Sequence, residues 1–403
     1  MWRNRSILGL IAAELVSLTG SSMTFVALPW FVLVTTGSPA KLGWVMAAQL
    51  APLAIFGIPA GSVIGRLGAK RTMLVSDAAR GPLMLVLPVL VWTGRLTFPA
   101  ILVVAFAIGF FTAPYFSSSR LVIPEAVGDD ERGVAEVNAV LGGANTLTQI
   151  AGPALAGVLI SATSPSVVLV VDAATYVFSF LTIAIVVRAG KRVDATEESE
   201  GLLAGLRYLM RDPLLGPLLV VACFLNLVID GLIVGINALG YFQYSSPRVA
   251  GLLICSFGVG SLLGALVAQQ LVQKVDLLKL AAVGILIMPL PLWALGVKMP
   301  WEAAIFVLAA FALGGPLVNA PVLGILTTKP PEALRPKVMT AVMTLAAGAG
   351  PLGFLAAGQA LRVISLQTLF LVIAGLLTVI SIAFATVLLR GRGPEQLAPV
   401  VAG

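Results

Sequence analysis

Long apolar runs separated by short polar gaps dominate the chain. Each run is long enough to cross a bilayer as a helix, which takes about 20 residues. The first run is expected to remain as a span and not to be cleaved as a signal peptide, because it is too long and lacks small residues at a cleavage position. The pattern predicts twelve spanning helices, near 6 to 35, 42 to 64, 72 to 93, 97 to 119, 134 to 161, 166 to 188, 214 to 243, 248 to 272, 277 to 297, 301 to 326, 336 to 362 and 366 to 390.

Composition supports the bilayer as the solvent of this chain. Of its 403 residues, 59% are hydrophobic and 11% are charged, whereas about 25% are charged in a typical soluble domain. The chain has no His, and Cys223 and Cys255 are its only cysteines. These counts exclude His-based zinc sites, His-based triads and a disulfide framework, so neither a metal nor a cofactor is expected.

The basic residues predict the topology. With the N-terminus inside, nineteen of the 25 Lys and Arg residues fall in cytoplasmic gaps, and Arg80 falls within a span. The five on the other side are Lys41, Arg95, Arg248, Lys298 and Arg362. By the positive-inside rule, this asymmetry favours an even number of spans with both termini in the cytoplasm. The protein is expected to be a multi-pass protein of the bacterial inner membrane. It also accounts for the net charge of +7 without a nucleic-acid partner.

Matching motifs recur about two hundred residues apart. They are Gly57 and Gly61 with Gly260 and Gly264, Gly152-Pro153 with Gly350-Pro351, Arg188 with Arg390, and Ala113-Pro114 with Ala320-Pro321. The repeat predicts two six-helix bundles, at 1–190 and 213–403, that rock about a shared midplane cavity in a transporter. Residues 191–212 are predicted to be a cytoplasmic linker that includes an interfacial helix.

Several segments carry a family resemblance. They are 61–71 (GSVIGRLGAKR), 152–157 (GPALAG, with Gly152, Pro153 and Gly157), 17–22 (SLTGSS), 171–176 (VDAATY) and 350–353 (GPLG). Together they resemble the major facilitator superfamily, specifically its drug:proton antiporter branch with twelve spans, which includes macrolide-efflux and enterobactin-exporter-like proteins. The resemblance implies an all-α fold, a monomer, and a cytoplasmic gate that contains Arg66, Lys70 and Arg71.

Ionisable residues inside predicted spans are candidates for function, because a charge at bilayer depth costs at least about 2.5 kcal/mol. Glu14 lies roughly 12 Å into the first helix at 1.5 Å per residue, and Ser17 and Ser21 continue its face. Since the chain has no His, carboxylates and water must carry any protons. Glu14 is therefore predicted to couple protons, the alternative being a Glu that pairs near the cytoplasmic surface.

Asp230 lies a little past the middle of the seventh span, with Asn226 and Asn237 on neighbouring turns. It could couple protons, bind a cationic substrate, or hydrogen-bond between helices as a structural residue. Asp77 and Arg80 are three residues apart and are predicted to pair on one helix face as part of the gate. Asp172 is predicted to be structural.

Other polar and aromatic residues could line the cavity. Asn145, Gln149, Asn319 and Gln359 could offer hydrogen bonds, although amides also join helices. Phe110 and Phe111 could form an aromatic lining, although aromatic residues near helix ends also act as interface anchors.

The leading hypothesis is a proton-coupled exporter of amphipathic, drug-like molecules that works by alternating access. The alternative is a lipid, lysolipid or siderophore exporter that is not strictly proton-coupled. Membrane lipids are expected partners in either case. The chain lacks a phosphate-binding loop, so direct ATP use is not expected. An enzyme, such as an intramembrane aspartyl protease using Asp77 or Asp230, is not expected because no Gly-x-Gly-Asp segment occurs.

Overall fold

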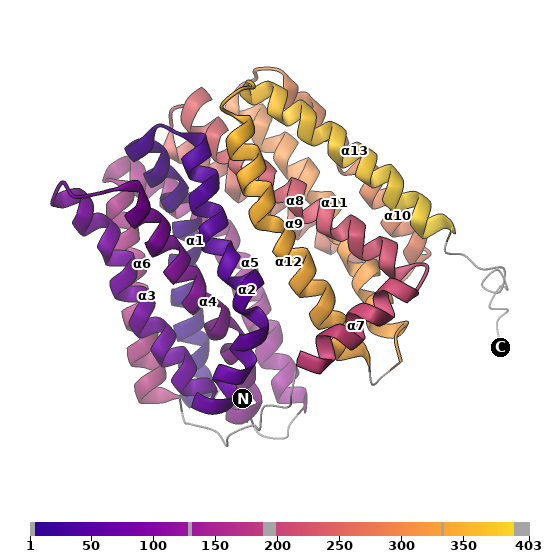
Figure 1. Ribbon diagram of the computed structural model, residues 1–403, viewed down its shortest axis with the longest axis horizontal. Helices are drawn as coiled ribbons and strands as arrows, with labels where there is room; N and C mark the ends of the chain where they lie inside the picture. The colour runs from indigo at the N-terminus through magenta and orange to yellow at the C-terminus, as the bar shows by residue number, and fades with distance from the viewer. Residues whose placement is uncertain (1–4, 128–130, 188–198, 332–333, 391–403) are drawn as a thin grey trace.

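The computed structural model describes residues 5–127, 131–187, 199–331 and 334–390, and within these ranges the regular elements are all helical (Figure 1). Two short irregular helices, η1 (Leu239–Gln243) and η2 (Leu290–Gly296), extend α8 and α10. The helices are α1 (Arg5–Thr36), α2 (Pro39–Leu67), α3 (Ala69–Trp92), α4 (Phe98–Val127), α5 (Glu131–Ala162), α6 (Pro165–Val186), α7 (Ser199–Arg211), α8 (Leu215–Ala238), α9 (Pro247–Leu271), α10 (Leu277–Ile287), α11 (Trp301–Thr328), α12 (Arg335–Ala360) and α13 (Leu366–Arg390).

Eleven spans in the described part of the chain are long and apolar enough to cross a membrane. Each coincides with one of the twelve predicted spans. The remaining predicted span corresponds to α5, a 32-residue helix that packs against α1 and α9. Its first turns carry Glu131, Arg132 and Glu136, and its middle carries Asn145 and Gln149. With these polar residues, α5 is not among the eleven spans.

The helices form two bundles. In the N-terminal bundle (α1–α6), α1 packs on α5 and α6, and α3 packs on α4 and α6. In the C-terminal bundle (α8–α13), α8 packs on α12 and α13, and α11 packs on α9 and α10. The main contacts between the bundles are α2 with α12 and α5 with α9.

Glycines allow the two bundles to approach closely at one end. A Cβ atom added to Gly43 would meet the backbone of Phe354 and Gly358 on α12, and one added to Gly251 would meet the backbone of Pro153 and Gly157 on α5. Without side chains, the backbones can lie against each other. We call these two contacts the glycine crossings. They lie at the end of the molecule where α1 leads into α2, which we call the converging end, and the bundles diverge toward the opposite end (Figure 1).

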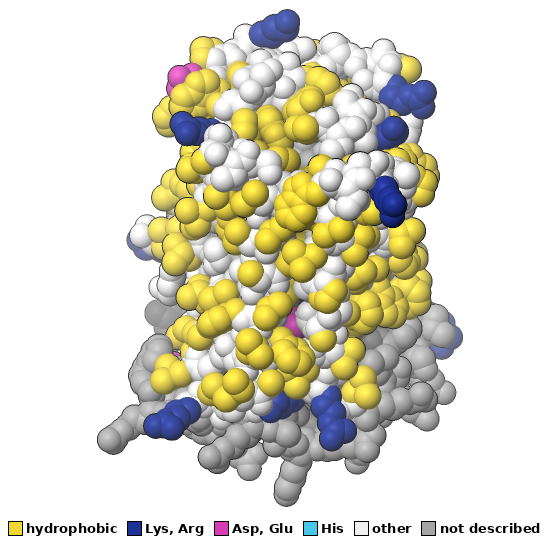
Figure 2. Space-filling model, turned by 90° about the vertical axis from the view of Figure 1, so that its left-hand side faces the viewer, with side chains coloured by type: hydrophobic (Ala, Val, Ile, Leu, Met, Phe, Trp, Pro, Cys, Tyr) yellow, Lys and Arg dark blue, Asp and Glu magenta, His cyan; other side chains and the backbone are white. Residues whose placement is uncertain are grey.

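The outer surface is apolar, as lipid contact requires. Large hydrophobic side chains such as Ile185 and Phe306 are 80% and 74% exposed. Figure 2 shows one flank of the molecule, where hydrophobic side chains dominate a middle band and Lys and Arg lie toward the ends. An exposed apolar surface of this extent marks a membrane-facing region.

The short helix α7 differs from the others because it has one apolar face and one polar face. Leu209 is buried against α8 and α12, while Arg207 and Arg211 are exposed. A Cβ atom on Gly205 would meet the backbone of Lys337 and Val338, so α7 lies directly on the beginning of α12. This helix lies where the sequence predicts an interfacial helix; residues 191–198 of the predicted linker lie outside the described residues.

Candidate functional site

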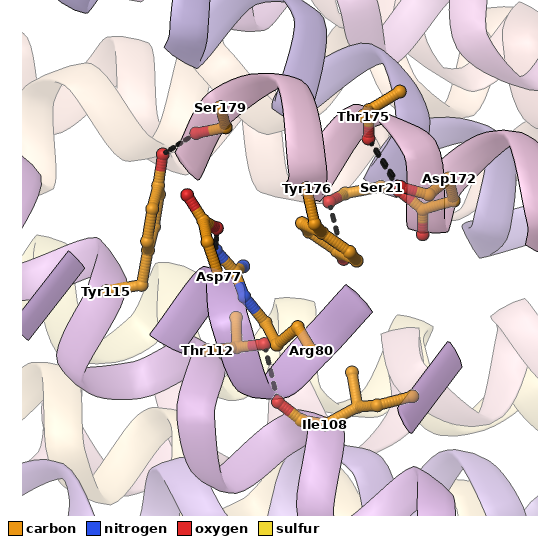
Figure 3. A network of polar contacts seen from close by, with 10 residues as sticks. All are labelled: Ser21, Asp77, Arg80, Ile108, Thr112, Tyr115, Asp172, Thr175, Tyr176 and Ser179. Carbon is orange, nitrogen blue, oxygen red and sulfur yellow. Dashed lines mark hydrogen bonds and ion pairs between the residues drawn. The ribbon is translucent and has the colours of Figure 1, made fainter. Parts of the chain in front are cut away.

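A network of charged and hydroxyl side chains is buried within the N-terminal bundle. At its centre, the guanidinium of Arg80 forms an ion pair with Asp77 one turn earlier on α3, and both side chains are buried. The pairing expected from their three-residue spacing is therefore present. The guanidinium also lies 4.1 Å from the ring centre of Tyr115 on α4 and 4.4 Å from that of Tyr176 on α6 (Figure 3). The two rings add cation–π attraction to the ion pair.

Asp172 on α6 forms a second part of this network. Its Oδ2 accepts a hydrogen bond of 2.5 Å from Thr24 on α1, and its Oδ1 accepts one of 3.2 Å from Thr175. The residue has no exposed surface. A Cβ atom on Gly20 would meet Asp172 and Thr175, so the glycine lets α1 approach the carboxylate. The Thr24 hydrogen bond joins α1 to α6, and the Thr175 hydrogen bond lies within α6.

Glu14 on α1 forms the third part. Its side chain is 6% exposed, and the hydroxyl groups of Tyr115 and Ser119 on α4 lie beside its carboxylate. Its Oε1 atom has no hydrogen-bond partner among the described residues. Tyr115 also shares a hydrogen bond of 3.3 Å with Ser179 on α6 (Figure 3). Tyr115 thus contacts both Glu14 and the guanidinium of Arg80.

The network contains more potential negative charge than positive charge. Glu14, Asp77 and Asp172 are three carboxyl groups, whereas Arg80 is the one cation that faces them among the described residues. A buried carboxylate needs a cation, hydrogen bonds or a proton to offset its lost hydration. Arg80 already pairs with Asp77. The carboxyl groups of Glu14 and Asp172 therefore have no paired cation among the described residues.

A cavity of about 400 Å³ lies between the two bundles and adjoins this network. Its described lining is mostly apolar and contains no charged side chain. The lining residues are Leu18, Ser21, Ser22, Phe25, Asn145, Gln149, Pro153, Ile233, Ile236, Ile254, Phe257, Gly258 and Ser261. Ser21 also shares a hydrogen bond of 3.1 Å with the Tyr176 hydroxyl, so one side chain belongs to both the cavity wall and the buried network (Figure 3).

Asp230 lies on α8, one turn before the cavity residue Ile233. It is half-buried, and a Cβ atom on Gly350 of α12 would meet its Oδ2 and the Leu50 side chain of α2. No described residue donates a hydrogen bond to it or pairs with it. Asp230 is thus a carboxylate beside the junction of the bundles, outside the described cavity lining and separate from the buried network.

The predicted cavity residues fall into two groups. Ser21, Asn145 and Gln149 line the cavity, where the Gln149 amide donates to Asn145 Oδ1 at 3.1 Å. The others are not part of its described lining. Among these, Ser17 is buried on α1, and Asn319 is exposed. Asn226 and Asn237 donate hydrogen bonds to the backbone of their own helix, and Gln359 accepts one from Arg362. Phe110 packs edge-on against Phe56 and Phe111.

The predicted gate residues also separate. Lys70 donates to the Ala184 carbonyl near the end of α6 at 3.1 Å, and Arg71 is exposed. Asp77 and Arg80 lie inside the N-terminal bundle. The side chain of Arg66 lies outside the described residues. In the helix-five motif, Gly152 faces the backbone of α1 at Ser22, Pro153 lines the cavity, and Gly157 belongs to a glycine crossing.

Sequence reasoning did not assign Tyr115, Tyr176 and Thr24 to a common site. Tyrosine hydroxyls within apolar spans were the available signal, because a buried hydroxyl needs a partner. It also did not select Phe25 and Phe257, which lie on α1 and α9 and face the cavity.

Known proteins resemble the chain in both sequence and fold. A relative named multidrug efflux pump Tap, from Mycolicibacterium fortuitum, is 27% identical over 91% of this chain and 92% of its own length. A protein of the same name from Mycobacterium tuberculosis is 24% identical over 91% of this chain and 89% of its own length. The nucleoside transporter NupG superposes with a TM-score of 0.79 at 14% identity, covering 94% of this chain and 98% of its own. A bacterial homologue of the lysosomal transporter Spinster in its inward-facing, unoccupied conformation superposes with a TM-score of 0.76 at 13% identity, covering 98% and 100%.

The likeness to these solved structures shows that the chain shares their fold. Residues 10–245, more than half of the chain, match the sequence profile of one transporter family. The chain belongs to the Major Facilitator Superfamily.

Proposed function

We propose that this protein is a secondary active exporter that moves amphipathic small molecules out of the cell in exchange for protons. The observation that carries the proposal is the Ser21–Tyr176 hydrogen bond, which joins the cavity wall to the buried acids. A substrate that displaces or reorients Ser21 would change the surroundings of Tyr176, and therefore those of Arg80 and Asp172. Substrate occupancy and proton occupancy would be coupled through these contacts.

The cavity supports the substrate class. Phe25, Phe257 and several Ile side chains offer apolar contact, while Ser21, Asn145 and Gln149 offer a few hydrogen bonds. Such a lining suits a molecule with a large apolar part and few polar groups. The relatives named multidrug efflux pumps support the same class and the outward direction of transport.

The buried carboxyl groups support proton coupling. We infer that Glu14 takes up and releases the coupling proton, because its carboxylate is buried, faces hydroxyl groups instead of a paired cation, and has one oxygen without a described partner. Asp77 and Arg80 serve as the fixed charge pair beside it. In this proposal, Asp230, one turn before the cavity residue Ile233, is a second acid that favours cationic substrates.

The contacts between the bundles support alternating access. In this proposal, both termini lie in the cytoplasm, and α5 crosses the membrane together with the other eleven spans. The converging end then faces the outside of the cell. The structure then corresponds to a conformation closed outward and open inward in the inner membrane. Export requires the glycine crossings to separate while the opposite ends approach. In this proposal, Arg66, Lys70 and Arg71 form the cytoplasmic gate.

Transport in proteoliposomes tests the proposal. The purified protein is reconstituted, a pH gradient is imposed, and the flux of ethidium is followed by fluorescence. We expect flux to depend on the gradient in the wild type and to lose that dependence in Glu14→Gln. Glu136→Gln, which changes an exposed glutamate on α5, is the matched control and should behave as the wild type. Flux indifferent to the gradient, with Glu14→Gln fully active, would contradict proton antiport.

A further inference from the structure

A second cavity lies at the end of the C-terminal bundle where α7 meets α8 and the connection between α11 and α12. Its volume is about 440 Å³, and it is separate from the central cavity. It is lined by Arg207, Tyr208, Arg211, Asp212, Pro213 and Leu334. Its position follows from the amphipathic character of α7, which buries Leu209 against the bundle and presents its polar face to the cavity.

The arginines give this cavity its charge. Arg207 and Arg211 are four residues apart, so they lie one turn from each other on one helix face. Both are exposed, and no described residue forms an ion pair or a hydrogen bond with either guanidinium. Guanidinium groups bind phosphate through paired hydrogen bonds. Two of them on one wall form a site for a phosphate group.

The acid in this cavity does not cancel that charge, because it has its own cation. Asp212 accepts a hydrogen bond of 2.8 Å from Lys329, and its Oδ1 also accepts from the backbone N–H groups of Leu214 and Leu215. Partial burial acts to raise the pKa of Asp212, but the contacts with Lys329 and the backbone outweigh it and hold the pKa below its ordinary value. Asp212 is thus a fixed, neutralised part of the wall.

An apolar surface continues from the cavity along α8. Pro213 lines the cavity just before α8 begins, and Val220 and Phe224 lie four residues apart on one face of that helix. They are 45% and 53% exposed. Ile233, which lines the central cavity, lies on a different face of α8. A ligand with a phosphate at the arginines and an acyl chain along Val220 and Phe224 would match both surfaces.

We propose that this cavity is a binding site for the headgroup of an anionic phospholipid such as phosphatidylglycerol. An interfacial helix with basic residues at the cytoplasmic surface, beside an exposed apolar helix face, favours such a lipid. Arg207 and Arg211 bind the phosphate, and Val220 and Phe224 contact an acyl chain. The site is distinct from the transport cavity, and its occupancy is measured without any transport assay.

Lipid binding to the full-length protein in detergent tests the proposal. Phosphatidylglycerol or phosphatidylcholine is titrated in, and retained lipid is measured by native mass spectrometry and by the shift of the thermal unfolding midpoint. We expect selective retention of phosphatidylglycerol, weakened about tenfold in Arg207→Gln/Arg211→Gln. Lys274→Gln/Lys279→Gln removes the same number of exposed charges elsewhere and should bind as the wild type.

Competition by inorganic phosphate and a second double variant complete the test. Inorganic phosphate at millimolar concentration should compete poorly, because it lacks the acyl chain. Equal retention of both lipids by the wild type, equal binding by the two double variants, or full competition by inorganic phosphate would overturn the proposal. If the arginine variant does not fold, Val220→Ser/Phe224→Ser should still weaken retention of phosphatidylglycerol, and unchanged retention would count against the site.

Discussion

The two bundles share an architecture but differ in the chemistry of their cores. Of the described buried polar or charged side chains, fourteen lie in α1–α6 and three, Asn237, Ser256 and Ser381, lie in α8–α13. Among the residues whose burial is described, the buried charged groups are Glu14, Asp77, Arg80 and Asp172, and all four lie in the N-terminal bundle. In the C-terminal bundle, the contact between α10 and α13 is filled by apolar residues such as Ala281, Ile285 and Phe384.

The difference shows which features the fold requires and which belong to function. Both bundles need long apolar helices, and both contribute to the glycine crossings, through Gly43 and Gly157 in one and Gly251 and Gly358 in the other. Charges in the core are not required, because the C-terminal bundle forms the corresponding packing without them. We therefore propose a role in transport for the charged network of the N-terminal bundle.

The largest expected effect comes from removing the central cation. Arg80→Met leaves Asp77 buried without its partner, and breaking a buried pair from one side costs about 3–5 kcal/mol. Thermal unfolding in detergent measures this loss. Arg71→Met, which changes an exposed arginine on the same helix, is the control. The double variant Asp77→Asn/Arg80→Met should recover part of the loss. If Arg80→Met unfolds at the same temperature as Arg71→Met, the Asp77–Arg80 pair does not stabilise the fold.

The glycine crossings test what the two bundles share. Gly43→Ala and Gly251→Ala each add a Cβ against the facing backbone, and overpacking of this kind costs about 1–3 kcal/mol. We expect both to destabilise the outward-closed conformation and to lengthen the distance between spin labels at positions 38 and 363. Gly315→Ala, where a Cβ meets open space, is the control. Unchanged distances in both variants would mean that the crossings do not close the converging end.

Asp230→Asn tests the half-buried acid on α8 of the C-terminal bundle. It has no described partner, so Asp230→Asn should change stability little. We expect efflux of a permanently cationic dye to fall about tenfold, equivalent to about 1.4 kcal/mol, while efflux of a neutral drug persists. Parallel efflux assays with the two substrates measure the difference. Equal losses for both substrates would assign Asp230 to the general mechanism and would remove the contrast with the N-terminal acids.

Tyr176→Phe tests the link between the cavity and the network with the smallest expected effect. It removes the hydroxyl that bonds Ser21 but keeps the ring over Arg80, so the stability loss should be about 0.5–1.5 kcal/mol. Substrate binding should persist, while its dependence on pH should weaken. Binding titrations at several pH values measure this effect, with Tyr208→Phe on α7 as the control. An unchanged pH dependence would show that the Ser21–Tyr176 bond does not couple the two sites.

The sequence was sufficient to predict the long helices, the family and the Asp77–Arg80 pair, because these depend on apolar length, motifs and spacing along one helix. Contacts between helices could not be predicted in the same way. The positions of Tyr115 and Tyr176 around Arg80 depend on how α4 and α6 rotate against α3. For the same reason, Asn145 and Gln149 line the cavity, whereas Asn319 and Gln359 do not.

Proton release upon substrate binding tests the central claim most directly. Saturating substrate is added to the purified protein in weakly buffered detergent solution, and a pH indicator follows the proton count. The account predicts proton release by the wild type and by Glu136→Gln, and none by Glu14→Gln that still binds substrate. Substrate binding without proton release in the wild type, or undiminished release by Glu14→Gln, would contradict it.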